Sequence, residues 1–491
     1  MDIMNVIGKC VVAGNVRRTA EIAFGDPCDQ DYISLKDYNQ NPERAEFGWT
    51  SNNSVFATLG MDYSQVCERV ITNGEPGFAW LENMRKYGRM CDPPNNKDHR
   101  ALGGNPCLEQ TLESYELCCL VETFPNKHDS LEDFMKSVHL ATTYAKTVTL
   151  GSTHWPQSNK VMLRNRRIGV SMSGVAQFLS SHNLNDLKDW CNSAYEQVTK
   201  TDISISESLA IPKSIKTTSI KPSGTVSLLN GSTPGLHYPE SRFYIRRMRL
   251  AADSPLVEPL KEAKYDIEPA VGDEQTLVVS IPVDVGENVR TLEDVNMWEQ
   301  LSLAAFFQRY WADNQVSCTI SFDPETEGPD VPNALNVFQF QLKGISFLPK
   351  QEHGAYAQMP YEEISQEEYE EMSNRLSPIH FKPNEEQIPT MESNLEVDDE
   401  RDSSSKTKIN GKGINGRSQF FSNEPLLLNM TDSHPSSSKN NNISDAYSNQ
   451  SISEDFPDKF CDSDSCQVIS STTTTNHQEE KVNEIESLLK S

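Results

Sequence analysis

The sequence predicts an α/β fold with a largely parallel sheet, open or closed, because two kinds of pattern alternate along residues 1 to about 360. Apolar residues recur with helical spacing in three long stretches, at 131–148, 187–198 and 294–311. Short apolar or β-branched runs lie between them, at 216–220, 276–283 and 317–322. Long helices that separate short strands are typical of parallel sheets, whose neighbouring strands need a crossover connection.

The helical stretches each carry one apolar face. In the first, the residues that share this face are Leu131, Phe134, Met135, Val138, Ala141 and Ala145. In the second they are Leu187, Trp190, Cys191, Ala194, Tyr195 and Val198. We therefore expect these helices to bury one side against the sheet.

The composition changes after Pro360. From Glu362 to Glu400 there are thirteen acidic residues against two basic ones, and Ser/Asn-rich runs follow. Such a segment cannot bury a core, so we expect a disordered linker over 364–455 and a short C-terminal arm over 456–491. The folded part would then be 1–363.

The overall composition excludes several classes of protein. With 44 basic and 71 acidic residues the formal charge is −27, so neither nucleic acid nor a membrane surface is an expected partner. No apolar run approaches the roughly 20 residues of a membrane span. The first residues lack the features of a secretion signal, and eleven cysteines in a chain of this length do not form a disulfide scaffold. We expect a cytoplasmic protein with mostly reduced thiols.

The stretch GGNPCLEQTLESYELCC, from Gly103 to Cys119, is the richest in chemistry. Glycines and a proline mark a loop around Cys107, where a thiol gains little from packing, although a buried cysteine in a turn is the plain alternative. In an extended loop Asn105 and Glu109 would lie on the same side as Cys107. A carboxylate there raises a thiol's pKa, which suits a sulfur that carries a hydrogen atom better than a thiolate nucleophile.

Two further polar runs are candidate ligand-binding segments. KPSGTVS follows a strand-like run, and its glycine and hydroxyls fit an anion, although an ordinary strand-to-helix turn would look the same. SNNSV offers neutral hydrogen-bonding groups, with a polar turn as the alternative. The candidate residues are Pro222, Ser223, Gly224, Thr225 and Ser227 in the first run and Ser51, Asn52, Asn53 and Ser54 in the second.

Taken together, these motifs resemble the ribonucleotide reductases, and in particular the adenosylcobalamin-dependent, class II, monomeric ribonucleoside-triphosphate reductases. The resemblance extends over residues 1–363. It is carried by the finger-loop motif Asn-Pro-Cys-x-Glu and by AGNVRRTAEIAFG (13–25), SNNSV (51–55), NGEPGFAWLEN (73–83), RIGVSMSGV (167–175), KPSGTVSLLNGSTPGLHYP (221–239), NQVSCTISFDP (314–324), LKGISF (342–347) and YAQMPYE (356–362).

The resemblance implies a ten-stranded α/β barrel with the finger loop through its centre. By the same resemblance, Cys107 would become the thiyl radical that removes the ribose 3′ hydrogen. Glu109 would take the 3′-hydroxyl proton, and Asn105 would bind the 2′-hydroxyl region. Cys118 has the spacing of one member of the dithiol that reduces the ribose. Cys119, on the opposite side of the chain, has no role.

The resemblance also implies cofactors and partners. Cys461 and Cys466 have the family's C-x4-C spacing and would pass electrons from thioredoxin or a similar dithiol to the buried disulfide. No Tyr-Tyr pair and no glycyl-radical motif is present, which favours adenosylcobalamin as the radical source. Ribonucleoside triphosphates would be substrates and deoxynucleotides effectors.

One departure from the family leads to an alternative. The family's partner of Cys118 lies far upstream, and Cys10, Cys28, Cys67 and Cys91 are too close to the finger loop to replace it. We therefore expect an N-terminally incomplete piece that lacks the first half of the barrel. A non-catalytic remnant is then the second hypothesis, and a thioredoxin-linked disulfide reductase a weaker third.

Overall fold

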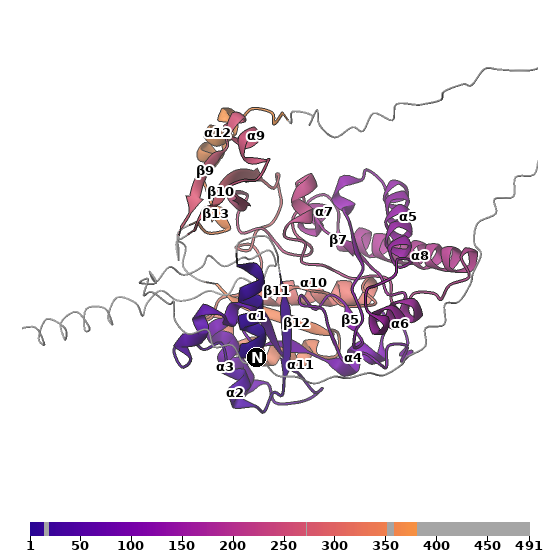
Figure 1. Ribbon diagram of the computed structural model, residues 1–491. Coiled ribbons are helices and arrows are strands. Elements are labelled where there is room, and N and C mark those ends of the chain that lie inside the picture. The colour runs from indigo at the N-terminus through magenta and orange to yellow at the C-terminus, as the bar shows by residue number, and fades with distance from the viewer. Residues whose placement is uncertain (14–18, 272, 351–357, 381–491) are drawn as a thin grey trace, which may run out of the picture. The chain divides into compact units, whose positions relative to one another are not determined.

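The protein is described by a computed structural model over residues 1–13, 19–271, 273–350 and 358–380 (Figure 1). Its helices are α1 Asp2–Val12, α2 Gln30–Ile33, α3 Ser64–Asn73, α4 Leu81–Lys86, α5 Leu131–Val148, α6 Pro156–Asn165, α7 Val175–Leu179, α8 Leu184–Ser208, α9 Val257–Glu262, α10 Met297–Tyr310, α11 Val331–Phe338 and α12 Gln366–Arg375. Its strands are β1 Glu21–Gly25, β2 Ser51–Phe56, β3 Gly77–Ala79, β4 Gly103–Gly104, β5 Thr111–Leu112, β6 Leu120–Thr123, β7 Gly169–Met172, β8 Phe243–Ala251, β9 Asp266–Ala270, β10 Asp273–Asp284, β11 Thr319–Phe322, β12 Gly344–Pro349 and β13 Tyr361–Glu363.

The main strands form one continuous series. The order β1-β2-β3-β12-β11 is a five-stranded sheet, in which β3 and β12 are antiparallel and the other pairs are parallel. Single parallel bridges, Ile220 to Val316 and Val170 to Thr218, extend the series through the segment 216–220 to β7 and then to its parallel neighbour β6. The α/β prediction is confirmed, and strands of both directions are present.

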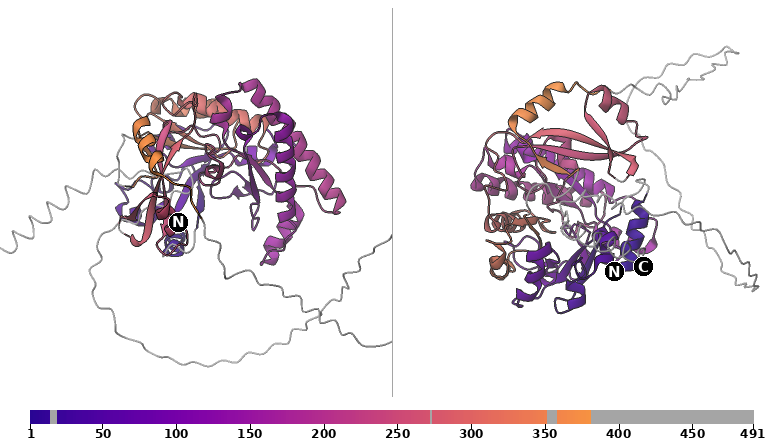
Figure 2. Two further views of the ribbon diagram at one scale, coloured as in Figure 1. Left: turned by 90° about the horizontal axis from the view of Figure 1, so that it is seen from above. Right: turned by 90° about the vertical axis from the view of Figure 1, so that its left-hand side faces the viewer.

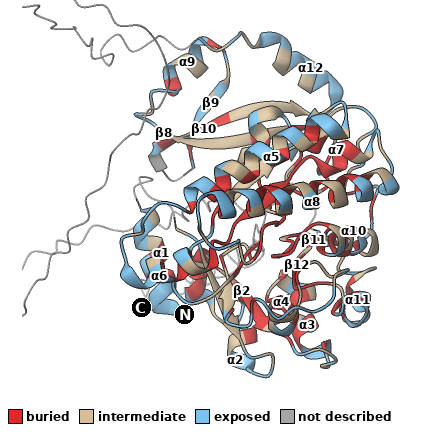
Figure 3. Cartoon of the chain, turned by 90° about the vertical axis from the view of Figure 1, so that its right-hand side faces the viewer, coloured by how far each residue is buried: buried red, intermediate tan, exposed pale blue. Residues whose placement is uncertain are grey.

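The predicted helices are found where the spacing places them. The first stretch is α5, the second lies in α8 and the third contains α10. α5 packs against α8 and against β6 and β7, and Figure 3 shows buried residues along the inner sides of α5 and α8. Hydrophobic periodicity therefore identified both the helices and the sides that they bury.

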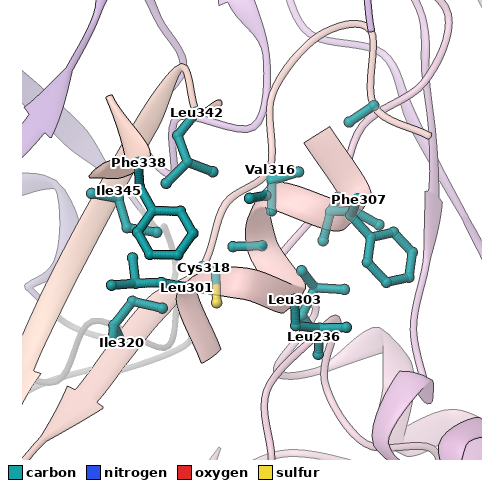
Figure 4. Close-up of a cluster of buried hydrophobic side chains, with 14 of the residues drawn as sticks. Leu236, Leu301, Leu303, Phe307, Val316, Cys318, Ile320, Phe338, Leu342 and Ile345 are labelled. Atoms are coloured by element: carbon teal, nitrogen blue, oxygen red, sulfur yellow. The ribbon is translucent and has the colours of Figure 1, made fainter. Parts of the chain in front are cut away.

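A large apolar core lies between the strand series and the helices. Figure 4 shows part of it, where side chains of α10 and α11 meet those of β11, β12 and the loops beside them. The labelled members are Leu236, Leu301, Leu303, Phe307, Val316, Cys318, Ile320, Phe338, Leu342 and Ile345. This core supports the strands from outside and leaves their other side to the polar residues described below.

One predicted strand belongs to a different sheet. The run 276–283 lies in β10, which pairs antiparallel with β8 and β9 in the four-stranded sheet β13-β8-β10-β9 (Figure 2). The expectation of a single, largely parallel sheet is therefore wrong for this run. Alternation of apolar residues indicates a strand but does not say which strand it pairs with.

The folded part also extends beyond the predicted boundary at 363. Ser365 and Glu368 form a reciprocal capping box that starts α12, and Tyr369 packs its ring on Phe243 of β8. Ser377 N donates a hydrogen bond to a backbone oxygen of the same small sheet region, at Ala263. The linker prediction was therefore wrong for its first residues. The rest of the linker and the whole C-terminal arm lie outside the described residues.

A buried ion network closes the base of the hairpin formed by β4 and β5. Arg167, just before β7, is fully buried and pairs with Asp98 (2.7 Å), which precedes β4, and with Glu116 (3.0 Å), which follows β5. Lys216 also pairs with Asp98, at 3.0 Å. One guanidinium thus joins both ends of the hairpin to the strand series.

We expect Arg167→Met to lower the free energy of unfolding by about 3 kcal/mol, because it leaves two buried carboxylates without their main partner. Urea denaturation followed by circular dichroism would measure the change. The control is Arg100→Met, which removes an exposed arginine of the same segment and should stay within about 0.5 kcal/mol of wild type. Equal destabilisation by both substitutions would contradict the role of Arg167.

Candidate active site

The loop around Cys107 is the tip of a short hairpin. β4 pairs antiparallel with β5. Asn105 accepts a hydrogen bond from Leu108 N (2.8 Å), and Leu108 has a φ of 58°. The Asn105 side-chain oxygen also accepts from Gln110 N, at 2.9 Å. The tip is therefore a tight turn, and the assumed alternation of an extended loop does not apply to it.

Two hydrogen bonds attach the tip to strands on different sides. Asn52 of β2 donates from its side-chain nitrogen to Pro106 O, at 2.9 Å. Gln315, just before β11, donates its backbone N–H to Glu109 O, at 3.1 Å. In the strand series β2 and β11 are separated by β3 and β12, so the hairpin lies across the polar side of the strands.

Two glycines make room for the hairpin. A Cβ atom at Gly344 of β12 would lie 2.6 Å from Leu108 Cδ2, and one at Gly169 of β7 would overlap Gln110 Nε2. Glycine is thus required at these positions, because the hairpin touches the backbone of both strands. β7, β12 and β2 surround the hairpin, as the finger-loop resemblance predicts.

Glu109 is a buried acid with an unused oxygen. Its side chain is 2% exposed, and Oε2 has no hydrogen-bond partner within the described residues. Burial raises the pKa of Glu109, while the side chain of Asn105 and the charge of Lys221 lower it. A carboxyl group of this kind is suited to exchange a proton with a bound ligand.

The cysteines at 107, 118 and 119 have different surroundings. Cys107 at the tip is half-buried, and Cys118 is exposed just before β6. Desolvation of the Cys118 thiol and the nearby carboxylate of Glu109 both raise the pKa of Cys118. Cys119 points into the apolar core and donates to Ala145 O at 3.3 Å, so the prediction that it lies opposite Cys118 is confirmed.

The polar run 51–55 is part of strand β2, so its alternative interpretation as a turn is wrong. Ser51 donates to Asn53 Oδ1 at 3.0 Å, and Asn53 N donates to Glu75 Oε1 at 3.3 Å. Ser51, Asn53 and Ser54 are buried, whereas Asn52 reaches the finger-loop tip. Asn52 therefore connects this strand to the finger loop.

The second polar run forms a turn at the carboxyl end of segment 216–220. Ser223 is buried with a φ of 57°, and Ser227 donates its hydroxyl to Ser223 O at 2.6 Å. Pro222 and Gly224 are also buried, and Thr225 is exposed. Ligands of parallel sheets bind at this end of the strands, so the position fits an anion site.

Unpaired buried polar atoms gather in these segments. Buried polar groups normally have partners, so an unpaired set indicates where a ligand supplies them. Within the described residues the set from the hairpin, β6 and the loops after the strands is Glu109 Oε2, Gln110 Oε1, Thr111 Oγ1, Glu122 Oε2, Ser219 Oγ, Ser223 Oγ and Thr233 Oγ1.

Lys221 and Glu122 are site residues that the sequence analysis did not identify. Burial raises the pKa values of Glu109, Cys118 and Glu122, and the charge of Lys221 lowers all three. Glu122 lies four residues after Cys118 along β6. A signal for it was available, because side chains an even number of positions apart on a strand share a side.

The two cysteines of the predicted redox arm, Cys461 and Cys466, lie outside the described residues. Their role therefore stays a prediction. Among the residues that the structure does describe, no group of three or more histidine, cysteine or acidic side chains is arranged to hold a metal ion.

Comparison with known proteins gives close relatives. No family model matches the chain. It is 61% identical over 385 residues to the probable adenosylcobalamin-dependent ribonucleoside-triphosphate reductase of Dictyostelium discoideum, which covers 78% of this chain and 51% of that protein. It is 60% identical over 376 residues to the adenosylcobalamin-dependent enzyme of Euglena gracilis, with 76% and 52% covered.

The comparison with solved structures points to the same family of reductases. The crystal structure of a B12-dependent, class II ribonucleotide reductase aligns with a TM-score of 0.68 at 34% identity, over 77% of this chain and 56% of the other. This chain is homologous to the class II ribonucleotide reductases. It spans about half the length of the curated relatives that it matches. The class Id α subunit of Actinobacillus ureae, at 16% identity and a TM-score of 0.51, shares the reductase fold.

The packing of the finger loop predicts the effect of Gly169→Ala. The added methyl group would overlap Gln110 Nε2 and lie 2.6 Å from Leu120 Cδ2 and Ser219 Oγ, so the hairpin must move. We expect a loss of about 1–3 kcal/mol in unfolding free energy and faster alkylation of Cys107, measured by peptide mass spectrometry.

The control for this substitution is Gly151→Ala. Its added methyl group would lie 3.4 Å from the nearest atom, Val148 O, which is an ordinary contact. Both the stability and the alkylation rate of Cys107 should stay at wild-type values. An unchanged Cys107 rate in Gly169→Ala would mean that β7 does not hold the finger loop.

Proposed function

We propose that this chain carries the catalytic centre for radical reduction of ribonucleoside triphosphates to 2′-deoxyribonucleoside triphosphates, the precursors of DNA. The main support is the hairpin that lies among β2, β7, β12 and the start of β11, with Cys107 at its tip and the buried acid Glu109 near Cys118. The names of the homologous reductases support the same reaction.

In this reaction the Cys107 sulfur, as a thiyl radical, takes the hydrogen atom from C3′, so that an S–H bond forms and the C3′–H bond breaks. Glu109 accepts the 3′-hydroxyl proton, and its unpaired Oε2 and raised pKa suit that transfer. Asn105 holds the 2′-hydroxyl region. The 2′-hydroxyl leaves as water, and Cys107 returns its hydrogen to C3′ at the end.

The two electrons and two hydrogens for the ribose come from a pair of thiols. Cys118 would be one of them, oxidised as the 2′ carbon is reduced. It would form a disulfide with the family's upstream partner cysteine, which we expect this chain to lack and which an added dithiol such as dithiothreitol would replace. Overall, one ribonucleotide and two thiols give one deoxyribonucleotide, one disulfide and one water. The position of Cys118 just before β6, close to Glu109, supports this role.

The substrate would lie over the carboxyl ends of the strands. The turn from Pro222 to Ser227 would hold the polyphosphate, with Gly224 and the hydroxyls of Ser223 and Thr225 as the nearest groups. The polar residues of β2, Ser51 to Ser54, would lie beside the sugar. The unpaired hydroxyls of Ser223 and Thr233 support the phosphate site.

Adenosylcobalamin is the cofactor that we propose, by homology to reductases that depend on it. It would supply the radical through its cobalt–carbon bond when bound. The half-buried thiol of Cys107 is partly accessible at the hairpin tip, as contact with a bound cofactor would require. Cys107 is the residue that would face it.

The remaining parts of the proposal concern regeneration and regulation. Cys461 and Cys466 would reduce the active-site disulfide by exchange and be reduced in turn by thioredoxin or a similar dithiol. A monomeric enzyme with deoxynucleotide effectors is what the resemblance to the family implies, and the composition indicates a cytoplasmic, reducing compartment. Residues 456–491 would form the redox arm, joined by the segment that starts after α12.

A non-catalytic role is the second candidate. It is favoured by one observation, that the chain spans about half the length of its curated relatives. In that case the finger loop, β2 and the turn after segment 216–220 would keep their arrangement, but the chain would not reduce nucleotides. Activity of the chain itself decides between the two functions.

We expect the chain to convert CTP to dCTP with adenosylcobalamin and dithiothreitol under anaerobic conditions, and Cys107→Ala to abolish this conversion. Chromatographic detection of dCTP measures it. Cys28→Ala is the control, since Cys28 is exposed and outside the site. No dCTP from the wild-type chain would favour the non-catalytic role, and dCTP from Cys107→Ala would exclude Cys107 as the radical carrier.

We expect Cys461→Ser in the full-length protein to spare a single turnover by the pre-reduced enzyme but to stop multiple turnover with thioredoxin. The reason is that the active-site thiols are intact while their reduction needs the arm. Comparing dCTP per chain with and without thioredoxin measures both. Equal losses in the two assays would contradict a relay role for this cysteine.

A further inference from the structure

Glu122 has no part in the reaction described above, yet it lies at the carboxyl end of β6 beside the phosphate turn. Its Oε1 accepts hydrogen bonds from two hydroxyls of β7 and the residue after it, Ser171 Oγ at 3.0 Å and Ser173 Oγ at 2.7 Å. Its Oε2 is buried without a hydrogen-bond partner in the described part of the chain. One carboxyl group therefore fixes two neighbouring hydroxyls.

Each of these hydroxyls in turn accepts a hydrogen bond from a backbone N–H of the loop 221–235, which contains the proposed phosphate turn Pro222–Ser227. Ser171 Oγ accepts from Lys221 N at 2.8 Å, and Ser173 Oγ accepts from Gly235 N at 2.9 Å. Because a serine hydroxyl has a single proton, its donation to Glu122 leaves its lone pairs for these backbone groups. The carboxyl thus sets the direction of both hydrogen bonds.

Lys221 and Gly235 are the two ends of one loop, and they touch. Gly235 has a φ of 49°, and a Cβ atom there would lie 2.5 Å from Lys221 O. The loop between them contains the phosphate turn and the unpaired hydroxyls of Ser223 and Thr233. Fixing its two ends therefore fixes the shape of the anion site.

The electrostatic surroundings agree with this arrangement. Burial raises the pKa of Glu122 to about 7, and Ser173, Ser171, Lys221 and Ser223 lower it. Ser223, which belongs to the turn itself, is thus close to the carboxyl. Through Ser171 and Ser173, Glu122 is connected to the loop at its start and at its end.

We propose that Glu122 is a positioning residue that, through Ser171 and Ser173, holds both ends of the loop 221–235 in the shape that binds a polyphosphate. The identity of the ligand rests on the proposed function, whereas the hydrogen-bonded clamp does not. Glu122 acts on the loop through the serines and takes no part in bond making.

Hydrogen–deuterium exchange on the full chain tests the clamp without a ligand. In Glu122→Ala the peptides covering 219–225 and 232–238 should both exchange about tenfold faster, because each loses an oriented acceptor. Ser171→Ala should affect the first peptide and Ser173→Ala the second. Glu122→Gln, whose amide oxygen can still accept from both hydroxyls but carries no charge, should fall between Glu122→Ala and wild type.

The matched control is Glu196→Ala, which removes an exposed acid from α8. It should leave both peptides unchanged. Unchanged exchange in Glu122→Ala would overturn the proposal, and so would equal loosening of both peptides in each serine variant, since that would indicate general destabilisation.

A binding titration separates the clamp from the proposed function. With CTP as the probe, Glu122→Ala should weaken binding about tenfold while binding of cytidine stays the same. If the wild-type chain binds neither compound, the proposed function fails and the exchange result alone decides the clamp. If it binds CTP and Glu122→Ala binds it equally well, the clamp is wrong and the proposed function stands.

Discussion

The arrangement of the site depends on one buried cation. Arg167 joins Asp98, before the hairpin, to Glu116, after it, and all three residues are buried. Burying a guanidinium and two carboxylates costs free energy. Their mutual attraction offsets that cost only if the three groups keep their close, hydrogen-bonded geometry. The network therefore specifies where the hairpin enters and leaves the strand series, whatever it adds to stability.

A rigid base has consequences for both cysteines. Glu116 lies between the hairpin and Cys118, so the same interaction sets the position of the tip and of the thiol before β6. The tip itself is held more lightly, by the Asn52 hydrogen bond and by close packing against Gly169 and Gly344. The role that we propose for Cys107, which would meet a cofactor at one time and a sugar at another, fits this combination of a fixed base and a partly accessible end.

The sequence could predict what depends on local pattern. Periodicity located α5, α8 and α10, and the motif around Cys107 identified the finger loop through its resemblance to a family. It could not predict that β10 joins another sheet, because alternation indicates a strand without its partner. Nor could it predict the pairing of Arg167 with Asp98, since 69 residues separate them and many other acids were available. The helix α12 was missed because an acidic composition outweighed the Ser365 capping signal.

The charges at the carboxyl ends of the strands follow a single logic. Burial raises the pKa values of Glu109, Cys118 and Glu122, which favours their neutral forms, and Lys221 opposes this for all three. For Glu109, the side chain of Asn105 and the charge of Lys221 both favour the ionised form, which is the form that can accept a proton. An ionised Glu122 without a nearby cation would also repel a polyphosphate bound beside it. Lys221 lies at the start of the loop 221–235, so a cation that favours the ionised acids also adds positive charge where we propose that a phosphate binds.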